Sequence, residues 1–230
     1  MTTIRKQNTV ERGLSRLNKF HKEGRLIRYS YEYPPVYKKE GKQFATILAA
    51  FSYKFAKNKD PLTVLTMPRW LACVTPMLDE LPEKEWAVNK DRYVAVLPRL
   101  LKLTPERLAR VEAQSMAIAL RENRQQFLPA TIMNPLYDVL SVLDRMGKGD
   151  VVSPEEMYLS REAMIQGSRK ESIPWRAATA ATAALAQING IGLSVYYASH
   201  GVVSPWDKWH MYETWLTCWE EACDALAPLK

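Results

Sequence analysis

The residues best suited to chemistry in this chain are cations spaced along one predicted helix near the start of the sequence. Arg12, Arg16 and Lys19 follow one another at i, i+4 and i+7, and Lys22 and Arg25 continue close to the same stripe. On a helix, this spacing places the side chains on one face. Cations on one face can each meet a phosphate of a nucleic-acid backbone and release condensed counterions. The chemistry that we expect here is electrostatic binding of a polyanion.

Aromatic side chains follow directly on this basic segment. Tyr29, Tyr31 and Tyr33 alternate with polar residues after Arg28, which is the periodicity of a β-strand. Tyrosines on an exposed strand beside arginines can stack on the bases of single-stranded nucleic acid. The alternative is that they pack beneath a helical core while the charges remain solvated. The segment forms either an extended arm or one strand of a small hairpin with Val36–Lys39.

The positive charge of the chain is segregated. The first 44 residues hold eleven Lys or Arg and four acids, a net charge of +7, which equals the net charge of all 230 residues. The remaining residues balance, with 21 basic and 21 acidic side chains. A concentrated positive field favours a polyanionic partner. Nucleic acid is the favoured target, and an acidic protein, an anionic membrane surface and a plain solvated face are the alternatives.

Two smaller groups of cations extend this interpretation. Lys38 and Lys39 belong to the basic N-terminal segment and are included in the expected nucleic-acid-binding set. A weaker basic cluster lies farther along the chain, at Arg161, Arg169, Lys170 and Arg176. Arg169 and Lys170 would contribute to the opposite wall of a groove if two lobes faced each other. The competing interpretation of this cluster is an ordinary exposed loop.

A tryptophan-rich stretch near the C-terminus has two interpretations. Trp209, Tyr212 and Trp219 fall near one helical face, with Trp215 beside them, and core packing is the favoured account. Trp206 and Trp209, near the start of this helix, would alternatively anchor a protein partner, because Trp is enriched at binding hot spots.

Helices must position these residues, since helix-start signals recur along the chain. A capping residue followed by Pro occurs at Asp60-Pro61, Thr104-Pro105, Ser153-Pro154 and Ser204-Pro205. Apolar residues also follow helical spacing, and one expected helix face comprises Phe44, Ile47, Leu48, Phe51 and Phe55. A further helix is expected over the Ala-rich segment 175–187.

These patterns predict a mainly α-helical fold, a multi-helix bundle with a basic N-terminal arm that contains a helix and a short strand or hairpin. The expected organisation is an arm over residues 1–43, a helical lobe over 44–146 and a C-terminal lobe over 153–230 with the Ala-rich and Trp-rich helices. Gly147–Val152 reads as the linker, although the two lobes could equally form one domain.

Other function classes have weak signals. The chain lacks GxSxG, GxxxxGK[ST], HExxH and GxGxxG, so we expect no enzyme and no cofactor. The three cysteines have neither disulfide nor metal-site spacing, which predicts no metal and a reducing compartment. No apolar run is long enough to span a bilayer, so no membrane partner is expected.

The sequence therefore predicts a non-catalytic nucleic-acid-binding protein, with RNA or single-stranded DNA favoured, that is cytoplasmic or part of a nucleoprotein particle. We expect other protein subunits as further partners. The alternative function is a helical adaptor or scaffold whose basic segment docks on an acidic protein, and an enzyme with a site assembled from distant residues is the third possibility.

Overall fold

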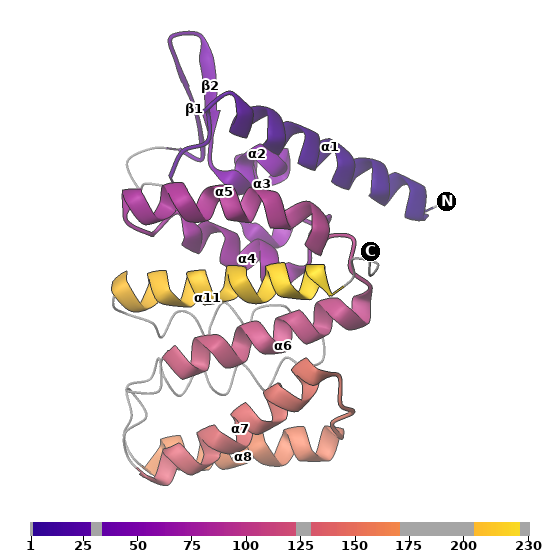
Figure 1. Cartoon of the computed structure of the whole chain (residues 1–230), viewed down its shortest axis with the longest axis vertical. Helices are drawn as coiled ribbons and strands as arrows, with labels where there is room; N and C mark the ends of the chain where they lie inside the picture. Colours follow the sequence, from indigo (N-terminus) through magenta and orange to yellow (C-terminus); the bar gives the residue numbers. More distant parts are fainter. Residues whose placement is uncertain (1, 29–33, 123–129, 171–204, 226–230) are drawn as a thin grey trace. The chain divides into compact units, whose positions relative to one another are not determined.

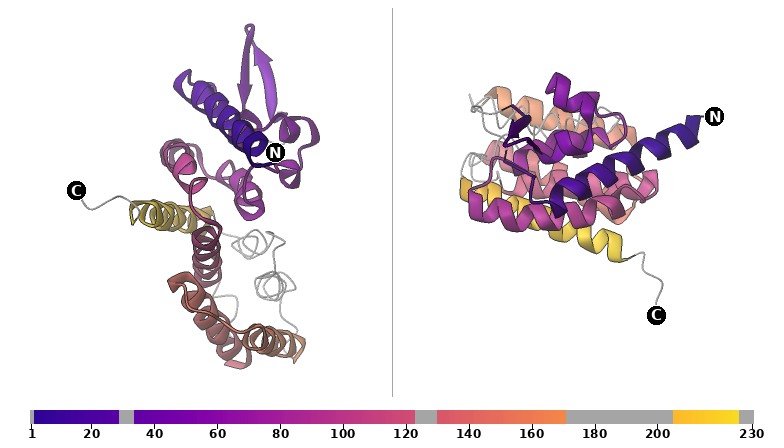
Figure 2. Two further views of the ribbon diagram at one scale, coloured as in Figure 1. Left: turned by 90° about the vertical axis from the view of Figure 1, so that its right-hand side faces the viewer. Right: turned by 90° about the horizontal axis from the view of Figure 1, so that it is seen from above.

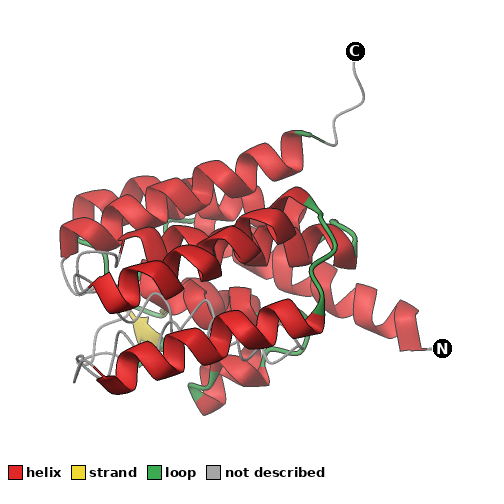
Figure 3. Cartoon of the chain, turned by 90° about the horizontal axis from the view of Figure 1, so that it is seen from below, coloured by secondary structure: helices red, strands yellow, loops and turns green. Residues whose placement is uncertain are grey.

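The structure is a computed structural model that describes residues 2–28, 34–122, 130–170 and 205–225. The chain divides into two compact units, Met1–Leu101 and Lys102–Lys230. Helices predominate in the described ranges, and a two-stranded antiparallel sheet lies near the N-terminus (Figure 1 and Figure 3). The predicted mainly helical fold with a short hairpin is confirmed.

Unit 1 contains a long first helix, a hairpin and a set of shorter helices. In chain order these are α1 (Thr2–Lys22), β1 (Val36–Lys39), β2 (Lys42–Ala45), α2 (Ile47–Phe51), α3 (Tyr53–Asn58), the 3-10 helix η1 (Pro61–Thr63), α4 (Arg69–Leu78) and α5 (Glu83–Leu100). The described helices of unit 2 are α6 (Pro105–Glu122), α7 (Ala130–Lys148), α8 (Pro154–Lys170) and α11 (Pro205–Asp224). None of the described helices is both long and apolar enough to cross a membrane.

The four predicted helix starts are confirmed. η1, α6, α8 and α11 each begin at the proline of a predicted pair. The Leu62 amide donates to Asp60 Oδ1 at 2.9 Å, and the Glu156 amide donates to Ser153 Oγ at 3.1 Å. These side chains satisfy amides that have no partner inside the first helical turn.

The single helix predicted through Phe44 and Phe55 is wrong. Phe44 lies in β2, and two short helices follow it instead of one. Thr46 caps α2 by accepting from the Ala49 amide at 3.4 Å. The backbone of Ser52 is extended, with φ of −130° and ψ of 118°, and this separates α2 from α3. Apolar spacing alone could not reveal these breaks, because the buried residues on either side continue the helical period.

The hairpin pairs β1 with β2 in antiparallel register, from Val36 opposite Ala45 to Lys39 opposite Lys42. Its two-residue turn consists of Glu40 and Gly41, whose φ values of 51° and 75° are both positive, as a type I′ turn requires. The hairpin projects from the helices of unit 1 (Figure 1 and Figure 2). Val36–Lys39, one strand of the hairpin that the sequence offered as an alternative, is a strand and pairs with β2. Its expected partner, residues 29–33, lies outside the described residues.

The basic N-terminal segment is packed onto unit 1. α1 contacts α2 and α5, and Leu17 is fully buried. At Gly13 an added Cβ would lie 2.9 Å from Phe51 Cε2 and 3.0 Å from the Phe51 carbonyl oxygen. Glycine therefore permits the close approach of the two helices. The segment Gly147–Val152, predicted as a linker, lies in unit 2 between α7 and α8.

Unit 2 is organised around α6. α7 packs against both α6 and α8, and α11 packs on α6. Ser115 of α6 ties two indoles of α11 to this helix: Trp215 Nε1 donates to the Ser115 carbonyl at 2.8 Å, and Trp219 Nε1 donates to Ser115 Oγ at 2.9 Å. The predicted Ala-rich helix lies outside the described residues.

Candidate nucleic-acid interface

One side of α1 presents a stripe of cations and hydrogen-bond donors. Arg12, Ser15, Lys19 and Lys22 are exposed and recur at three- or four-residue steps, whereas Gly13 and Leu17 on the other side are buried. At 1.5 Å per residue the stripe from Arg12 to Lys22 is roughly 15 Å long. Because the opposite side of α1 is docked on unit 1, the stripe has a fixed direction on the surface.

Three of these cations are available to a ligand. The side chains of Arg12, Lys19 and Lys22 make no hydrogen bond or ion pair with another residue in the described part of the chain. Each is exposed, so its charge is fully solvated in the free protein. Phosphate contacts would displace water and counterions from these side chains without breaking an internal interaction.

Arg16 has a different environment, although it shares the helical spacing of its neighbours. Its Nε donates to the Ala50 carbonyl at 3.1 Å, and its Nη2 donates to the Phe51 carbonyl. Its guanidinium also lies 3.7 Å from the centre of the Tyr53 ring. These carbonyls end α2, where the helix dipole favours a cation. Arg16 therefore fastens α1 to α2 through two hydrogen bonds inside the protein.

Arg25 and Arg28 are also held by unit 1. Arg25 Nη1 donates to the Gln43 carbonyl of β2 at 2.9 Å, and its guanidinium lies 4.4 Å from the centre of the Phe20 ring. It also forms an ion pair with Glu23. Arg28 Nε donates to the Asp79 carbonyl at 3.4 Å. Arg25 therefore connects the end of α1 to strand β2, which holds the basic helix and the hairpin together.

The hairpin tip adds a second group of exposed cations. Lys38, Lys39 and Lys42 are exposed and lie on either side of the Glu40-Gly41 turn. Below the tip, the rings of Tyr37 and Phe44 stack across the strands with centroids 5.3 Å apart. This cross-strand pair stiffens the two-stranded ribbon that carries the lysines. Sequence reasoning included the first two lysines in the expected site and missed Lys42, which the turn signal at Gly41 could have placed beside them.

The end of α1 is further anchored on α5. His21 Nε2 lies 2.8 Å from Asp91 Oδ1. Partial burial raises the pKa of Asp91, but the hydrogen bond from His21 and the charge of Lys90 outweigh it and lower the pKa below its usual value. Asp91 is therefore ionised at neutral pH and accepts from the imidazole, which holds the last turn of the basic helix in place.

The remaining predicted site residues are placed less completely. Tyr29, Tyr31 and Tyr33 lie outside the described residues. Arg169 and Lys170 end α8 and Trp206 is the second residue of α11, but their side chains are not among those described. Trp209 is half-buried on α11. In the same helix Tyr212, Trp215 and Trp219 are buried, so the favoured core interpretation of this cluster is confirmed.

Neutral donors on α1 were missed by the sequence reasoning. Ser15, Asn18, Lys19, Lys22 and Glu23 line a shallow surface depression along the last turns of the helix. Hydroxyl and amide side chains are common phosphate contacts in nucleic-acid complexes. Their helical spacing from Lys19 and Lys22 was the signal that could have identified them.

Comparisons with known proteins return no relative. No family model, no curated protein and no solved structure matches this chain. The charge, exposure and contacts of the described residues are therefore the basis on which a function can be inferred.

Proposed function

We propose that this chain is a non-catalytic nucleic-acid-binding protein whose interface is the exposed stripe of α1 together with the tip of the β1–β2 hairpin. RNA or single-stranded DNA is the favoured ligand, and the bound chain serves as a subunit of a nucleoprotein assembly. The observation that carries the proposal is the set of exposed cations on α1, Arg12, Lys19 and Lys22, on a helix whose other side is buried.

In this proposal the basic residues have two different roles. Arg12, Lys19 and Lys22 bind backbone phosphates along α1, and Lys38, Lys39 and Lys42 extend the phosphate contacts to the hairpin. Arg16, Arg25 and Arg28 contribute positive charge, but their hydrogen bonds support the interface from within unit 1. Stacking of bases on Tyr29, Tyr31 and Tyr33 stays a prediction for the segment between these elements.

Two of the three cysteines have thiols that stay protonated at neutral pH. Burial raises the pKa of Cys73 to about 11, with a further contribution from the charge of Asp60. Burial, together with the charge of Glu221, raises the pKa of Cys218 to about 11. Since the thiolate is the nucleophilic form, both side chains are unreactive thiols at neutral pH.

The test compares two pairs of lysines that differ in position and in little else. Lys19→Ala/Lys22→Ala removes two charges from the α1 stripe, and Lys54→Ala/Lys57→Ala removes two from α3. Both pairs are exposed, lie in unit 1 and have three-residue spacing. Affinity for labelled single-stranded RNA, single-stranded DNA and duplex DNA is measured by fluorescence anisotropy across a salt series.

We expect the α1 pair to weaken single-strand binding about tenfold at moderate salt and to lower the slope of log affinity against log salt by about 1.4, or 0.7 for each lost phosphate contact. The α3 pair should change both quantities much less. Equal effects of the two pairs would contradict a defined interface. If the unaltered chain binds none of the three nucleic acids at moderate salt, the proposal fails and an acidic protein becomes the favoured partner.

A further inference from the structure

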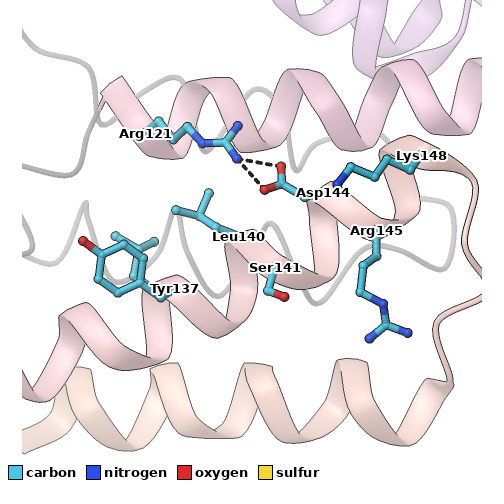
Figure 4. A pocket seen from close by; sticks show the side chains of 8 residues that line it. Arg121, Tyr137, Leu140, Ser141, Asp144, Arg145 and Lys148 are labelled. Atoms are coloured by element: carbon cyan, nitrogen blue, oxygen red, sulfur yellow. Dashed lines mark hydrogen bonds and ion pairs between the residues drawn. The ribbon is translucent and has the colours of Figure 1, made fainter.

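A groove in unit 2 runs along the exposed face of α7. It has a volume of about 440 Å³, within the range of small-molecule sites. Its lining comes from α7 and from the end of α6, and comprises Arg121, Leu136, Tyr137, Leu140, Ser141, Asp144, Arg145 and Lys148 (Figure 4). Along α7 the lining begins with Leu136, Tyr137 and Leu140 and ends with Asp144, Arg145 and Lys148, and Arg121 reaches Asp144 from α6.

The cationic end is preorganised by ion pairs. Arg121 Nη2 donates to both carboxylate oxygens of Asp144 at 2.6 Å, which neutralises the one acid in the lining (Figure 4). Arg145, on the other side of the groove, pairs with Glu156 of α8. Lys148 is exposed and makes no hydrogen bond or ion pair with any described residue. The Arg121 guanidinium is held in position and keeps further N–H donors. The Arg145 guanidinium points toward α8, away from Arg121 and Lys148 (Figure 4).

The apolar end presents a large aromatic surface. Tyr137 is 58% exposed, so its ring is accessible to a ligand. Leu136 and Leu140 are buried beside it. Ser141 follows Tyr137 by one helical turn, and Asp144 and Lys148 continue the same face. Along α7 the groove therefore offers an aromatic ring, then a hydroxyl, then cations.

We propose that this groove binds a nucleotide, with the base stacked on Tyr137 and the phosphate held by Arg121 and Lys148. The order of groups in the groove matches the order in the ligand, since a nucleotide carries an aromatic base at one end, sugar hydroxyls that Ser141 can bond, and a phosphate at the other end. An acidic peptide would satisfy the cations but would leave the exposed ring without a partner of matching shape. The ligand is either a free nucleotide or one nucleotide of a single strand.

The experiment measures binding of AMP, adenosine, inorganic phosphate and the dinucleotide pApA to the full chain by equilibrium dialysis or ligand-observed NMR. The variants are Tyr137→Ala, Tyr137→Phe and Lys148→Ala. Tyr158→Ala is a matched control, since Tyr158 is 56% exposed on α8 of the same unit and does not line the groove. Lys102→Ala is the control for Lys148→Ala. Melting temperatures confirm that each variant is folded.

AMP should bind more tightly than either adenosine or phosphate. Tyr137→Ala should weaken AMP binding at least about fivefold, the lower end of the effect of losing one base stack. Tyr137→Phe should restore binding, because it keeps the ring. Lys148→Ala should weaken AMP and phosphate but not adenosine, and both controls should behave as the unaltered chain. Tighter binding of pApA than of AMP would assign the site to a single strand, and equal affinities would assign it to a free nucleotide.

Unchanged AMP affinity in Tyr137→Ala, or phosphate binding as tight as that of AMP, would overturn the proposal. The proposal would also be overturned if an oligoglutamate peptide displaced AMP from the protein and AMP could not displace the peptide. The site does not depend on the interface of unit 1: Lys19→Ala/Lys22→Ala should leave AMP binding unchanged. The two proposals can be separated. The double variant could lose oligonucleotide binding and keep AMP binding, or Tyr137→Ala could lose AMP binding and keep oligonucleotide binding.

Discussion

The first and last described helices, α1 and α11, present the same kind of sequence signal and have opposite environments. Each carries large side chains of binding-site type at helical spacing. On α1 the cations Arg12, Lys19 and Lys22 are exposed, whereas on α11 the aromatic residues Trp215 and Trp219 are fully buried against α6. The type and spacing of the residues predicted both helices and did not by themselves decide which one faces solvent.

The difference arises from what the neighbouring elements offer. On α6, Ser115 supplies a hydroxyl and a carbonyl that accept from the two indole N–H groups, so the tryptophans can be buried without an unsatisfied donor. The same principle applies within α1. The last carbonyls of α2 accept from Arg16, whereas the Lys19 side chain has no hydrogen bond or ion pair with a described residue. A side chain at a binding-type spacing remains available only where no adjacent element provides a partner.

The largest effect is expected when a buried tryptophan of α11 is truncated. Trp219→Ala should reduce the free energy of unfolding by about 3–5 kcal/mol, because it leaves a large cavity and removes the partner of Ser115 Oγ. Urea denaturation followed by circular dichroism measures the loss. Glu221→Ala, at an exposed position of the same helix, should change stability by less than about 0.5 kcal/mol. Similar losses in the two variants would show that α11 is not a core helix.

A second test concerns a charge that α6 buries, in contrast to the solvated charges of α1. Burial raises the pKa of Glu112 to about 7, and this carboxyl makes no hydrogen bond or ion pair with another described residue. The folded state then binds the proton more tightly than the unfolded state. The associated stability is present below the ordinary glutamate pKa and is lost as the pH rises to about 7.

Glu112→Gln should therefore stabilise the protein at pH 8, by about 2–3 kcal/mol, and have little effect at pH 4.5. Urea midpoints of the two proteins at a series of pH values measure the difference. A constant difference between the two proteins across this pH range would show that Glu112 titrates normally in the folded state.

The smallest expected effect is the difference in stability between variants of two cations of α1, Arg16 and Lys19. Arg16→Ala should cost about 2 kcal/mol of stability, since it removes charge-assisted hydrogen bonds to the end of α2, whereas Lys19→Ala should cost less than about 0.5 kcal/mol. Arg16→Lys keeps the charge and loses the planar fork, so it should recover only part of the stability. Thermal melts of the three variants provide the measurement.

Nucleic-acid affinity should give the reverse ranking at a temperature where all three variants are folded. Lys19→Ala should weaken binding and Arg16→Lys should not. If Arg16→Lys lowers affinity without lowering stability, then Arg16 belongs to the interface, and the division between supporting and binding cations is wrong.

The sequence predicted the features that depend on neighbouring residues. Helical spacing and capping pairs placed α6, α8 and α11 at their starts, because these signals act within one turn. It did not predict that Ser52 breaks the helix after Phe51, nor that β2 completes the hairpin. Both depend on how α1 and the hairpin pack on α2, and such contacts have no local signature.

The candidate site divides in the same way. Charge segregation pointed to the N-terminal segment, and Arg12, Lys19 and Lys22 are exposed as a binding role requires. The different role of Arg16 depends on carbonyls 34 and 35 residues away in the chain. The sequence did not indicate the groove on α7. Arg121 lines the groove from α6, and in the sequence it has no spacing that links it to the residues of α7.

The hairpin also has a consequence for the order in which the chain folds. The contact of Arg16 with Phe51 closes a loop of 35 residues, and closing a loop costs more entropy as its length increases. The hairpin brings Pro35 to Thr46, whose amide donates to the Pro35 carbonyl at 2.9 Å, and so removes about ten residues from the loop that remains open. Formation of the hairpin thus favours the docking of α1 on α2 early in folding. The contact of His21 with Asp91, which holds the last turn of the basic helix on α5, joins residues 70 positions apart and needs a longer segment of the chain.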